Sequence, residues 1–186
     1  MPFPTIWGVQ LTAFRAGTLR LPLAQWRLAR IDIGTDLILA YEGDYQWVLN
    51  AVTGDRNCGV SSTSNMLVCD CTTNNAIDDY PILYFTLGDL ALSLTPLQYF
   101  YQVHFTQENS LCLLLISSSN SGWVLGSVFS RVYYSEFDPV NQRIGFAPSR
   151  KSTLSSSPDS YIIWEVMSLT ALSIGLTYFV MREGCF

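Results

Sequence analysis

Short apolar and alternating runs separated by turn residues extend from residue 5 to about residue 148. The runs that predict strands are 6–11, 27–33, 82–87, 90–94 and 111–117. Glycine, alone or beside Asp or Ser, bounds most of these runs, as turns between strands require. Many short strands at close spacing indicate a mainly β fold. One helix is expected around 44–52, where aromatic and apolar residues recur at helical spacing.

The pattern changes after Phe146. Residues 149–160 are polar and rich in Ser and Pro, which predicts an exposed linker. Residues 161–181 then form an apolar run whose only charged residue is Glu165. A helix of this length would measure about 31 Å, which matches the hydrocarbon core of a bilayer. We therefore expect a single transmembrane helix followed by a short tail, 182–186. A buried C-terminal helix docked on a partner is the alternative.

Composition narrows the classes of function. The 186-residue chain is 49% hydrophobic and 13% charged, which excludes wholesale disorder and allows one domain with a sizeable core. Ten Lys and Arg against fifteen Asp and Glu give a formal net charge of −5. Because no basic patch occurs, nucleic-acid binding is not expected.

The chain contains five cysteines and a single histidine, His104. The cysteines are Cys58, Cys69, Cys71, Cys112 and Cys185. No second cysteine pair with zinc-finger spacing follows the C-x-C pair, so we expect no metal and no cofactor. Disulfides are the more plausible use of these residues, which places the domain in an oxidising compartment: lumenal, extracellular or intermembrane space.

Three separated stretches of the sequence contain recognisable motifs. Residues 29–38 (ARIDIGTDLI) place Asp32 between an apolar strand and a glycine turn, and residues 123–129 (WVLGSVF) and 137–147 (FDPVNQRIGFA) follow later. Together they resemble the C-terminal lobe of the pepsin-like (family A1) aspartic proteases. Residues 31–38 are similar to the family's I-V-D-T-G-T-S-L-I, residues 124–129 to I-L-G-D-V-F, and residues 137–147 to F-D-x-x-N-x-R-I-G-F-A.

The resemblance covers roughly residues 5–148 and includes residues 81–85 and 94–99, which are similar to the family's L-P-x-I-x-F…L-x-P-x-x-Y. It implies a single β-rich lobe with one or two short helices. The linker and membrane helix that follow resemble the membrane-anchored branch of the family, which includes the β-secretases. The N-terminal lobe of the family has no counterpart in this sequence.

The resemblance also implies a chemistry, in which two aspartates, one from each lobe, share one proton. Asp32 is the matching acid, and Thr35 could bond its outer oxygen; Gly34, Leu125 and Gly126 complete the motif. No second D-[TS]-G occurs in the sequence. Ile33 replaces the threonine whose hydroxyl locks the two active-site loops together, and Asp36 and Ser127 also depart from the motif. Asp32 is therefore expected to be a vestigial acid or half of a dyad.

The family's disulfide pattern implies a bridge from Cys112 to Cys69 or Cys71. The remaining member of the C-x-C pair could join Cys58. Cys185 lies beyond the expected membrane helix and is expected to be a free thiol.

We expect a catalytically incomplete, aspartic-endopeptidase-like lobe that is anchored in a membrane by one span. It would act as a structural or interaction subunit of a larger membrane complex, with a protein partner covering the face normally occupied by the N-terminal lobe. The alternative is the C-terminal half of an active aspartic endopeptidase, whose N-terminal lobe is supplied by another chain or by a second copy.

Overall fold

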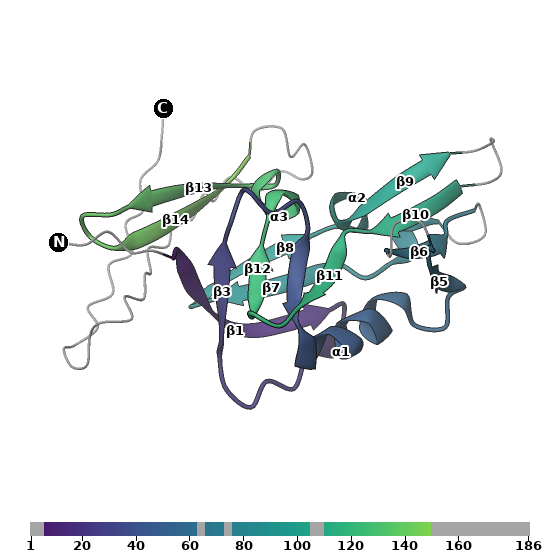
Figure 1. Cartoon of the computed structure of the whole chain (residues 1–186), viewed down its shortest axis with the longest axis horizontal. Helices are drawn as coiled ribbons and strands as arrows, with labels where there is room; N and C mark the ends of the chain where they lie inside the picture. The colour runs from purple at the N-terminus through teal and green to yellow at the C-terminus, as the bar shows by residue number, and fades with distance from the viewer. Residues whose placement is uncertain (1–5, 63–65, 73–75, 105–109, 150–186) are drawn as a thin grey trace.

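The computed structural model of the chain describes residues 6–62, 66–72, 76–104 and 110–149 (Figure 1). The expected linker from residue 150 on, the transmembrane helix 161–181 and the tail 182–186 lie outside the described residues. Among the residues that are described, none of the helices has the length and apolarity needed to cross a bilayer. The described part is mainly β with few helices, as the sequence predicts.

The elements are short and follow one another closely. The strands are β1 (Gly8–Ala16), β2 (Leu19–Arg20), β3 (Arg27–Ile31), β4 (Ile38–Tyr41), β5 (Cys58–Val60), β6 (Leu67–Asp70), β7 (Leu83–Leu87), β8 (Leu90–Leu94), β9 (Phe100–His104), β10 (Ser110–Leu114), β11 (Ile116–Ser119), β12 (Trp123–Leu125), β13 (Tyr133–Asp138) and β14 (Arg143–Pro148). The helices are α1 (Glu42–Thr53), α2 (Pro96–Tyr99), α3 (Ser127–Ser130) and the 3₁₀ helix η1 (Ile77–Asp79).

The predicted helix at 44–52 is confirmed as α1, and the predicted strands at 27–33, 82–87 and 90–94 are confirmed as β3, β7 and β8. The single strand predicted at 111–117 is wrong, because the run is divided between β10 and β11. Leu115 is the point of division: its N–H donates to the carbonyl of Tyr99, and its carbonyl accepts from the N–H of Ile38. The chain thus passes from one sheet to another at Leu115, which apolar character alone does not reveal.

Three sheets organise the lobe. The largest has the strand order β11-β4-β12-β3-β1-β7-β8, with β2 paired to β1. A four-stranded sheet has the order β5-β6-β10-β9, and β13 and β14 form a separate two-stranded ribbon. Within the large sheet, β12 runs parallel to β3 and antiparallel to β4. This placement of β12 between two consecutive strands determines the geometry of the loop that joins them.

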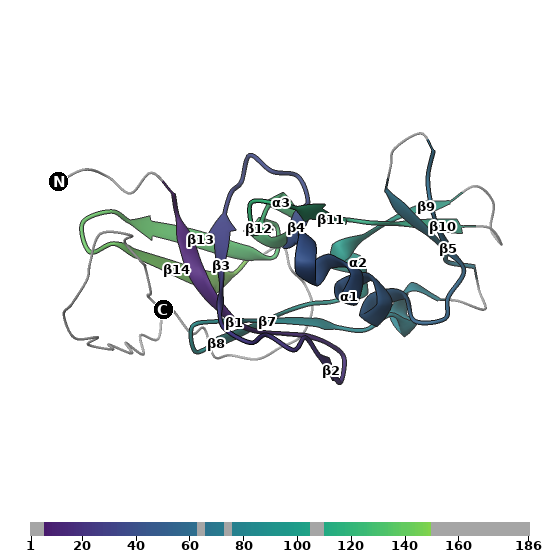
Figure 2. The same ribbon diagram turned by 60° about the horizontal axis from the view of Figure 1, so that its bottom comes forward.

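Strand β1 bends the large sheet. Its first half pairs with β3, whereas its second half pairs with β7. The register with β7 shifts between Leu11 and Ala13, so Thr12 is an extra residue of the kind that bends a strand. The Thr12 hydroxyl lies 2.8 Å from the carbonyl oxygen of Gly88 and 3.2 Å from that of Thr86. Figure 2 shows β1 passing from beside β3 to the layer that contains β7 and β8.

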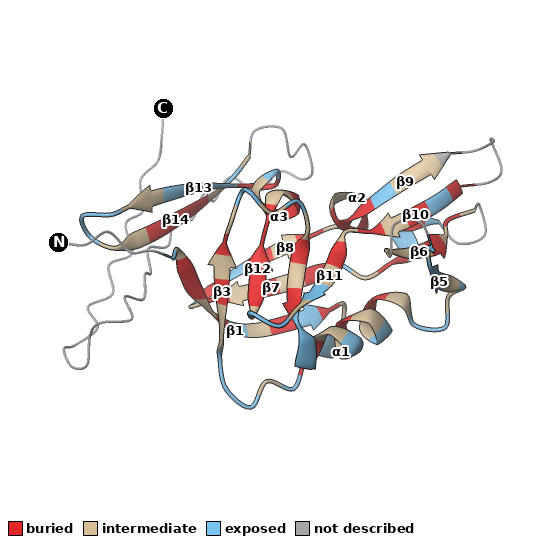
Figure 3. Cartoon of the chain, viewed as in Figure 1, coloured by how far each residue is buried: buried red, intermediate tan, exposed pale blue. Residues whose placement is uncertain are grey.

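The core lies in the bend of this sheet, where the neighbouring strands β4, β12, β3 and β1 all carry buried segments (Figure 3). Large aromatic side chains fill it. The ring centroid of Phe14 lies 5.0 Å from that of Phe85 and 5.2 Å from that of Trp123. These tilted and edge-on contacts add to the free energy gained by burying the rings.

Asp44 joins helix α1 to two strands of the large sheet. Its side chain is 8% exposed, and its carboxylate accepts three hydrogen bonds: from Trp123 Nε1 at 2.9 Å, from Arg27 Nε at 3.3 Å and from Arg27 Nη2 at 3.4 Å. Asp44 also lies in the first turn of α1, where the helix dipole favours a negative charge. The buried carboxylate therefore fixes α1 against β3 and β12 at once.

Two disulfides fasten the four-stranded sheet. Cys58 is joined to Cys69, and Cys71 to Cys112, with a sequence separation of 41 for the second bridge. Of the pairings left open by the sequence, the structure thus contains Cys71 with Cys112. In the chain-entropy model a loop of this length stabilises the fold by roughly 3–4 kcal/mol. Two disulfides indicate an oxidising compartment.

The β13–β14 ribbon is closed by a turn centred on Asp138. The Asn141 side-chain amide donates to the Asp138 carboxylate at 2.6 Å, and the backbone N–H groups of Val140 and Asn141 donate to it at 3.1 and 3.0 Å. Arg143 adds an ion pair at 3.2 Å. The hydrogen bonds from Asn141, followed by this guanidinium, hold the pKa of Asp138 below its ordinary value.

We predict that Asp44→Leu lowers the free energy of unfolding by about 2–4 kcal/mol, because the buried Trp123 N–H and the Arg27 guanidinium lose their acceptor. Urea denaturation followed by tryptophan fluorescence measures the loss. Glu42→Gln is the matched control, since Glu42 is an exposed acid in the same helical turn. Equal effects of the two substitutions would contradict the role assigned to Asp44.

Candidate functional site

The loop of residues 32–37 crosses over the end of β12. Leu125, the last residue of β12, pairs with Ile31 at the end of β3 and with Ile38 at the start of β4. The chain therefore leaves β3 on one side of β12, passes over its end and enters β4 on the other side. Figure 1 shows this loop at the top of the view, between the labels of β3 and α3.

Asp32 is held in one orientation by its own loop. Its backbone N–H donates to the carbonyl of Leu125 at 3.2 Å. Its Oδ1 accepts from the Gly34 N–H at 3.0 Å, and its Oδ2 accepts from the Thr35 hydroxyl at 3.1 Å. Both carboxylate oxygens thus have donors from residues within three positions of Asp32, and the carboxyl group remains half-buried at the surface.

The backbone of Gly126 lies directly against the backbone of the loop 32–37. A Cβ placed on Gly126 would lie 2.2 Å from the carbonyl oxygens of both Thr35 and Leu37, a distance that no real Cβ tolerates. The next residue fastens the same stretch: the Ser127 N–H donates to the Thr35 carbonyl at 2.7 Å, and its hydroxyl donates to the Asp36 carbonyl at 2.9 Å. Only glycine fits at position 126 without displacing the loop.

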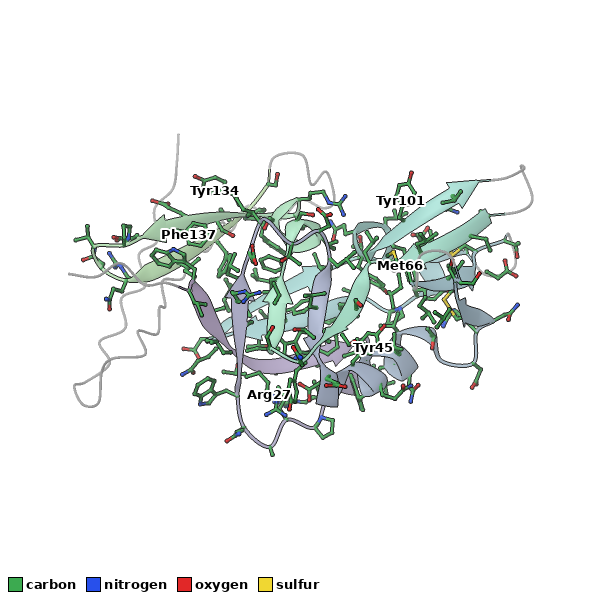
Figure 4. The ribbon with its side chains drawn as sticks, viewed as in Figure 1. Arg27, Tyr45, Met66, Tyr101, Tyr134 and Phe137 are labelled. Carbon is green, nitrogen blue, oxygen red and sulfur yellow. A yellow bond between two sulfur atoms is a disulfide. The ribbon has the colours of Figure 1, made fainter. Side chains whose placement is uncertain are left out.

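The structure brings together the sequence-predicted site residues Asp32, Gly34, Thr35, Leu125 and Gly126. The bridged cysteines lie apart from them, in and beside the four-stranded sheet, where the sulfur atoms appear in Figure 4. At the centre of the site is the Asp32 carboxylate, on a loop whose backbone is held by hydrogen bonds.

Sequence reasoning missed Arg30. Its Nη2 lies 3.5 Å from Asp32 Oδ2, and both side chains are 36% exposed. The Arg30 Nε is buried and has no hydrogen-bond partner within the part of the chain that the structure describes. The signal was available in the sequence, because the predicted strand 27–33 contains both Arg30 and Asp32, and residues two apart on a strand share a face.

Ile33 follows Asp32 in the loop. It is 72% exposed, so an apolar side chain occupies the surface position where the family motif has a hydroxyl. Among the described residues, no other Asp or Glu is hydrogen-bonded to Asp32. One carboxylate can accept hydrogen bonds or bind a cation, but it cannot by itself provide the shared proton of an aspartate pair.

Comparison with known proteins places these features in a family. The model of the family described as eukaryotic aspartyl protease matches residues 3–149. Cathepsin E from Aquarana catesbeiana is 33% identical over 144 residues, which cover 76% of this chain and 34% of the relative. Renin from Canis lupus familiaris is 36% identical over 150 residues, which cover 77% of this chain and 35% of the relative. The chain thus spans about a third of the length of these curated relatives.

The fold is also found among solved structures. The aspartic proteinase from Irpex lacteus superposes with a TM-score of 0.63 over 81% of this chain and 44% of that protein, at 22% sequence identity. At this level of identity the likeness concerns the fold, which matches a pepsin-like aspartic protease lobe.

We predict that Gly126→Ala lowers the free energy of unfolding by at least about 2 kcal/mol, because the added methyl group meets backbone oxygens that cannot rotate away. Gly59→Ala is the matched control: nothing lies within 4 Å of a Cβ at Gly59. Thermal denaturation of both variants compares them. A Gly126→Ala variant as stable as Gly59→Ala would refute the close approach of the loop.

Proposed function

This chain belongs to the eukaryotic aspartyl protease family, and from that premise we propose that it forms a C-terminal-type lobe that is catalytically incomplete by itself. It serves as a membrane-anchored structural or interaction subunit, within a larger membrane complex. The observation that carries this proposal is that, within the described residues, no other Asp or Glu is hydrogen-bonded to the Asp32 carboxylate.

Aspartic proteolysis requires two carboxylates at one water. One activates the water, while the other protonates the carbonyl oxygen of the substrate, and the pair holds one proton between them. Asp32 supplies one of these groups, already oriented by Gly34 and Thr35. The exposed Ile33 removes the hydroxyl that would lock this loop to a matching one. Both features support a chain that keeps the aspartic protease fold but does not catalyse proteolysis by itself.

A partner protein is part of the proposal. Ile33 is held at the surface by a loop whose backbone is fastened at Asp32, Thr35 and Asp36. An apolar side chain held in water gains free energy when another surface covers it. The partner would therefore cover the face around this loop, and the apolar residues 161–181 would anchor the assembly in a membrane.

The alternative is half of an active endopeptidase, with the second aspartate brought by another chain or by a second copy. The intact geometry around Asp32 favours it, because the Gly34 and Thr35 hydrogen bonds are those that a working carboxylate would need. The missing hydroxyl at Ile33 weighs against this alternative. It does so most strongly for two identical copies, because both active-site loops would then lack the hydroxyl that locks them together.

We predict that the purified full chain hydrolyses no peptide in an Asp32-dependent manner at acid pH. A quenched fluorescent peptide reports the activity, with Asp32→Ala as the test variant and Asp36→Ala as the matched control on the same loop. Hydrolysis that a pepstatin-like transition-state mimic blocks and that Asp32→Ala alone abolishes would overturn the proposal. If this activity appears only with a co-purified protein that carries its own D-T-G, the alternative replaces it.

We predict that the full chain remains in the membrane fraction after an alkaline wash, which strips peripheral proteins. Leu172→Arg combined with Ile174→Arg should release it, because charges near the centre of a bilayer cost about 2.5–3.5 kcal/mol each even on the insertion scale. Glu165→Gln is the control and should leave the chain in the membrane. An unaltered chain found in the supernatant would show that residues 161–181 do not anchor it.

A further inference from the structure

Two arginines lie directly opposite each other in the hairpin of β1 and β2. Arg15 in β1 is the register partner of Arg20 in β2. The neighbouring pair is hydrogen-bonded, because the Leu21 N–H donates to the Phe14 carbonyl at 3.0 Å. Hydrogen-bonded and non-hydrogen-bonded pairs alternate in an antiparallel ladder, and in the second kind the Cα atoms are only about 4.5 Å apart. The hairpin therefore places two positive side chains in the closest type of cross-strand pair.

Both arginines lie on the outer face of the large sheet. Phe14 and Ala16, which flank Arg15 in β1, are buried in the core, so the Arg15 side chain points to the opposite face. Arg15 and Arg20 are both exposed. Figure 2 shows their hairpin at the lower edge of the lobe. The pair is therefore accessible to a ligand from solvent.

No acid offsets the two positive charges within the described residues. The ion pairs found there involve other arginines. The outward residues that continue the same row across the sheet are Tyr84 in β7 and Ser93 in β8, and neither is charged at neutral pH. Like charges directly opposite each other destabilise a strand pair. This pairing is unfavourable even though the sequence has fifteen Asp and Glu against ten Lys and Arg.

Tyr84 orients one of the two guanidinium groups. The Arg15 Cζ lies 4.3 Å from the centroid of the Tyr84 ring, and Arg15 Nη1 lies 3.5 Å from the carbonyl oxygen of Gly17. A guanidinium stacked on a ring uses its flat face and keeps N–H groups at its edge for a ligand. Because Arg15 is partly held before anything binds, it loses less conformational entropy when a ligand arrives.

We propose that Arg15 and Arg20 form a binding site for a tetrahedral oxyanion, namely a sulfate or phosphate group. Each guanidinium presents a fork of N–H donors that matches two oxygens. A carboxylate has oxygens for one such fork, whereas a tetrahedral oxyanion has enough for two. The bound negative charge would also offset the repulsion between the arginines. A free ion and an ester on a larger molecule present the same group. The site contains no residue of the Asp32 loop, so it is independent of whether the lobe takes part in proteolysis.

The first test measures the repulsion in the absence of the oxyanion. In a chloride buffer of low ionic strength, Arg20→Gln should raise the melting temperature of the full chain by about 1–4 °C, because one of the two like charges is removed. Arg131→Gln is the matched control, since Arg131 is an exposed arginine that follows α3 and has no partner in a strand pair. It should leave the melting temperature unchanged. An Arg20→Gln variant that melts no higher than the unaltered chain would remove the basis of the proposal.

The second test measures binding, with sodium sulfate as the probe. In an NMR titration of the full chain in a non-ionic detergent, sulfate should shift the backbone amides of residues 15–20. Arg20→Gln should weaken this binding at least about tenfold, because charge-assisted hydrogen bonds are lost. Arg131→Gln should not change it. Arg20→Lys keeps the charge but lacks the fork, so its affinity should lie between those of the unaltered chain and Arg20→Gln.

A heparin-derived tetrasaccharide in the same titration distinguishes the two sources of the group. Tighter binding than that of sulfate, again lost in Arg20→Gln, supports the proposal with a sulfate ester as the ligand. Equal or weaker binding, with the sulfate effect intact, supports it with the free ion as the ligand. Sulfate that shifts no amide of the hairpin, or that binds Arg20→Gln as tightly as the unaltered chain, overturns the proposal.

Discussion

The contact between Gly126 and the carbonyl groups of Thr35 and Leu37 is the constraint on which the site depends. Since β12 lies between β3 and β4, the chain that joins those two strands must cross the end of β12, and it can do so only where no side chain stands. The crossing fixes the path of residues 32–37. That path turns the Asp32 carboxylate toward the Gly34 N–H and the Thr35 hydroxyl, so its orientation follows from backbone packing.

The rest of the lobe holds this crossing in place. At the opposite end of β12, the buried Asp44 carboxylate binds Trp123, and through Arg27 it also binds β3. The bulge at Thr12 folds the large sheet over an aromatic core, and the disulfides fasten the smaller sheet. At the end of the large sheet, the Tyr133 hydroxyl is hydrogen-bonded to the backbone N–H of Ser93 in β8. Together these features hold the loop that carries Asp32 in place.

Local sequence patterns predicted the elements that depend on interactions between residues close together in the chain. The hairpin of β7 and β8 follows from alternation around Gly88-Asp89, and α1 follows from apolar periodicity. The grouping of Asp32 with Leu125 and Gly126 followed only from the resemblance to a family. Three features depend on distant contacts and could not be predicted: the change of sheet at Leu115, the bulge at Thr12 and the burial of Asp44. The ion pair of Arg30 with Asp32 could have been found from strand alternation, because the two residues share a face.

In the proposed assembly, Asp32 has no second acid with which to share a proton. A high-resolution structure of the native assembly, purified from membranes through this chain, tests it most directly. We expect a partner surface packed around Ile33 and no Asp or Glu of any chain within hydrogen-bonding reach of Asp32. A second carboxylate facing Asp32, with a water molecule bound between the two, would contradict it.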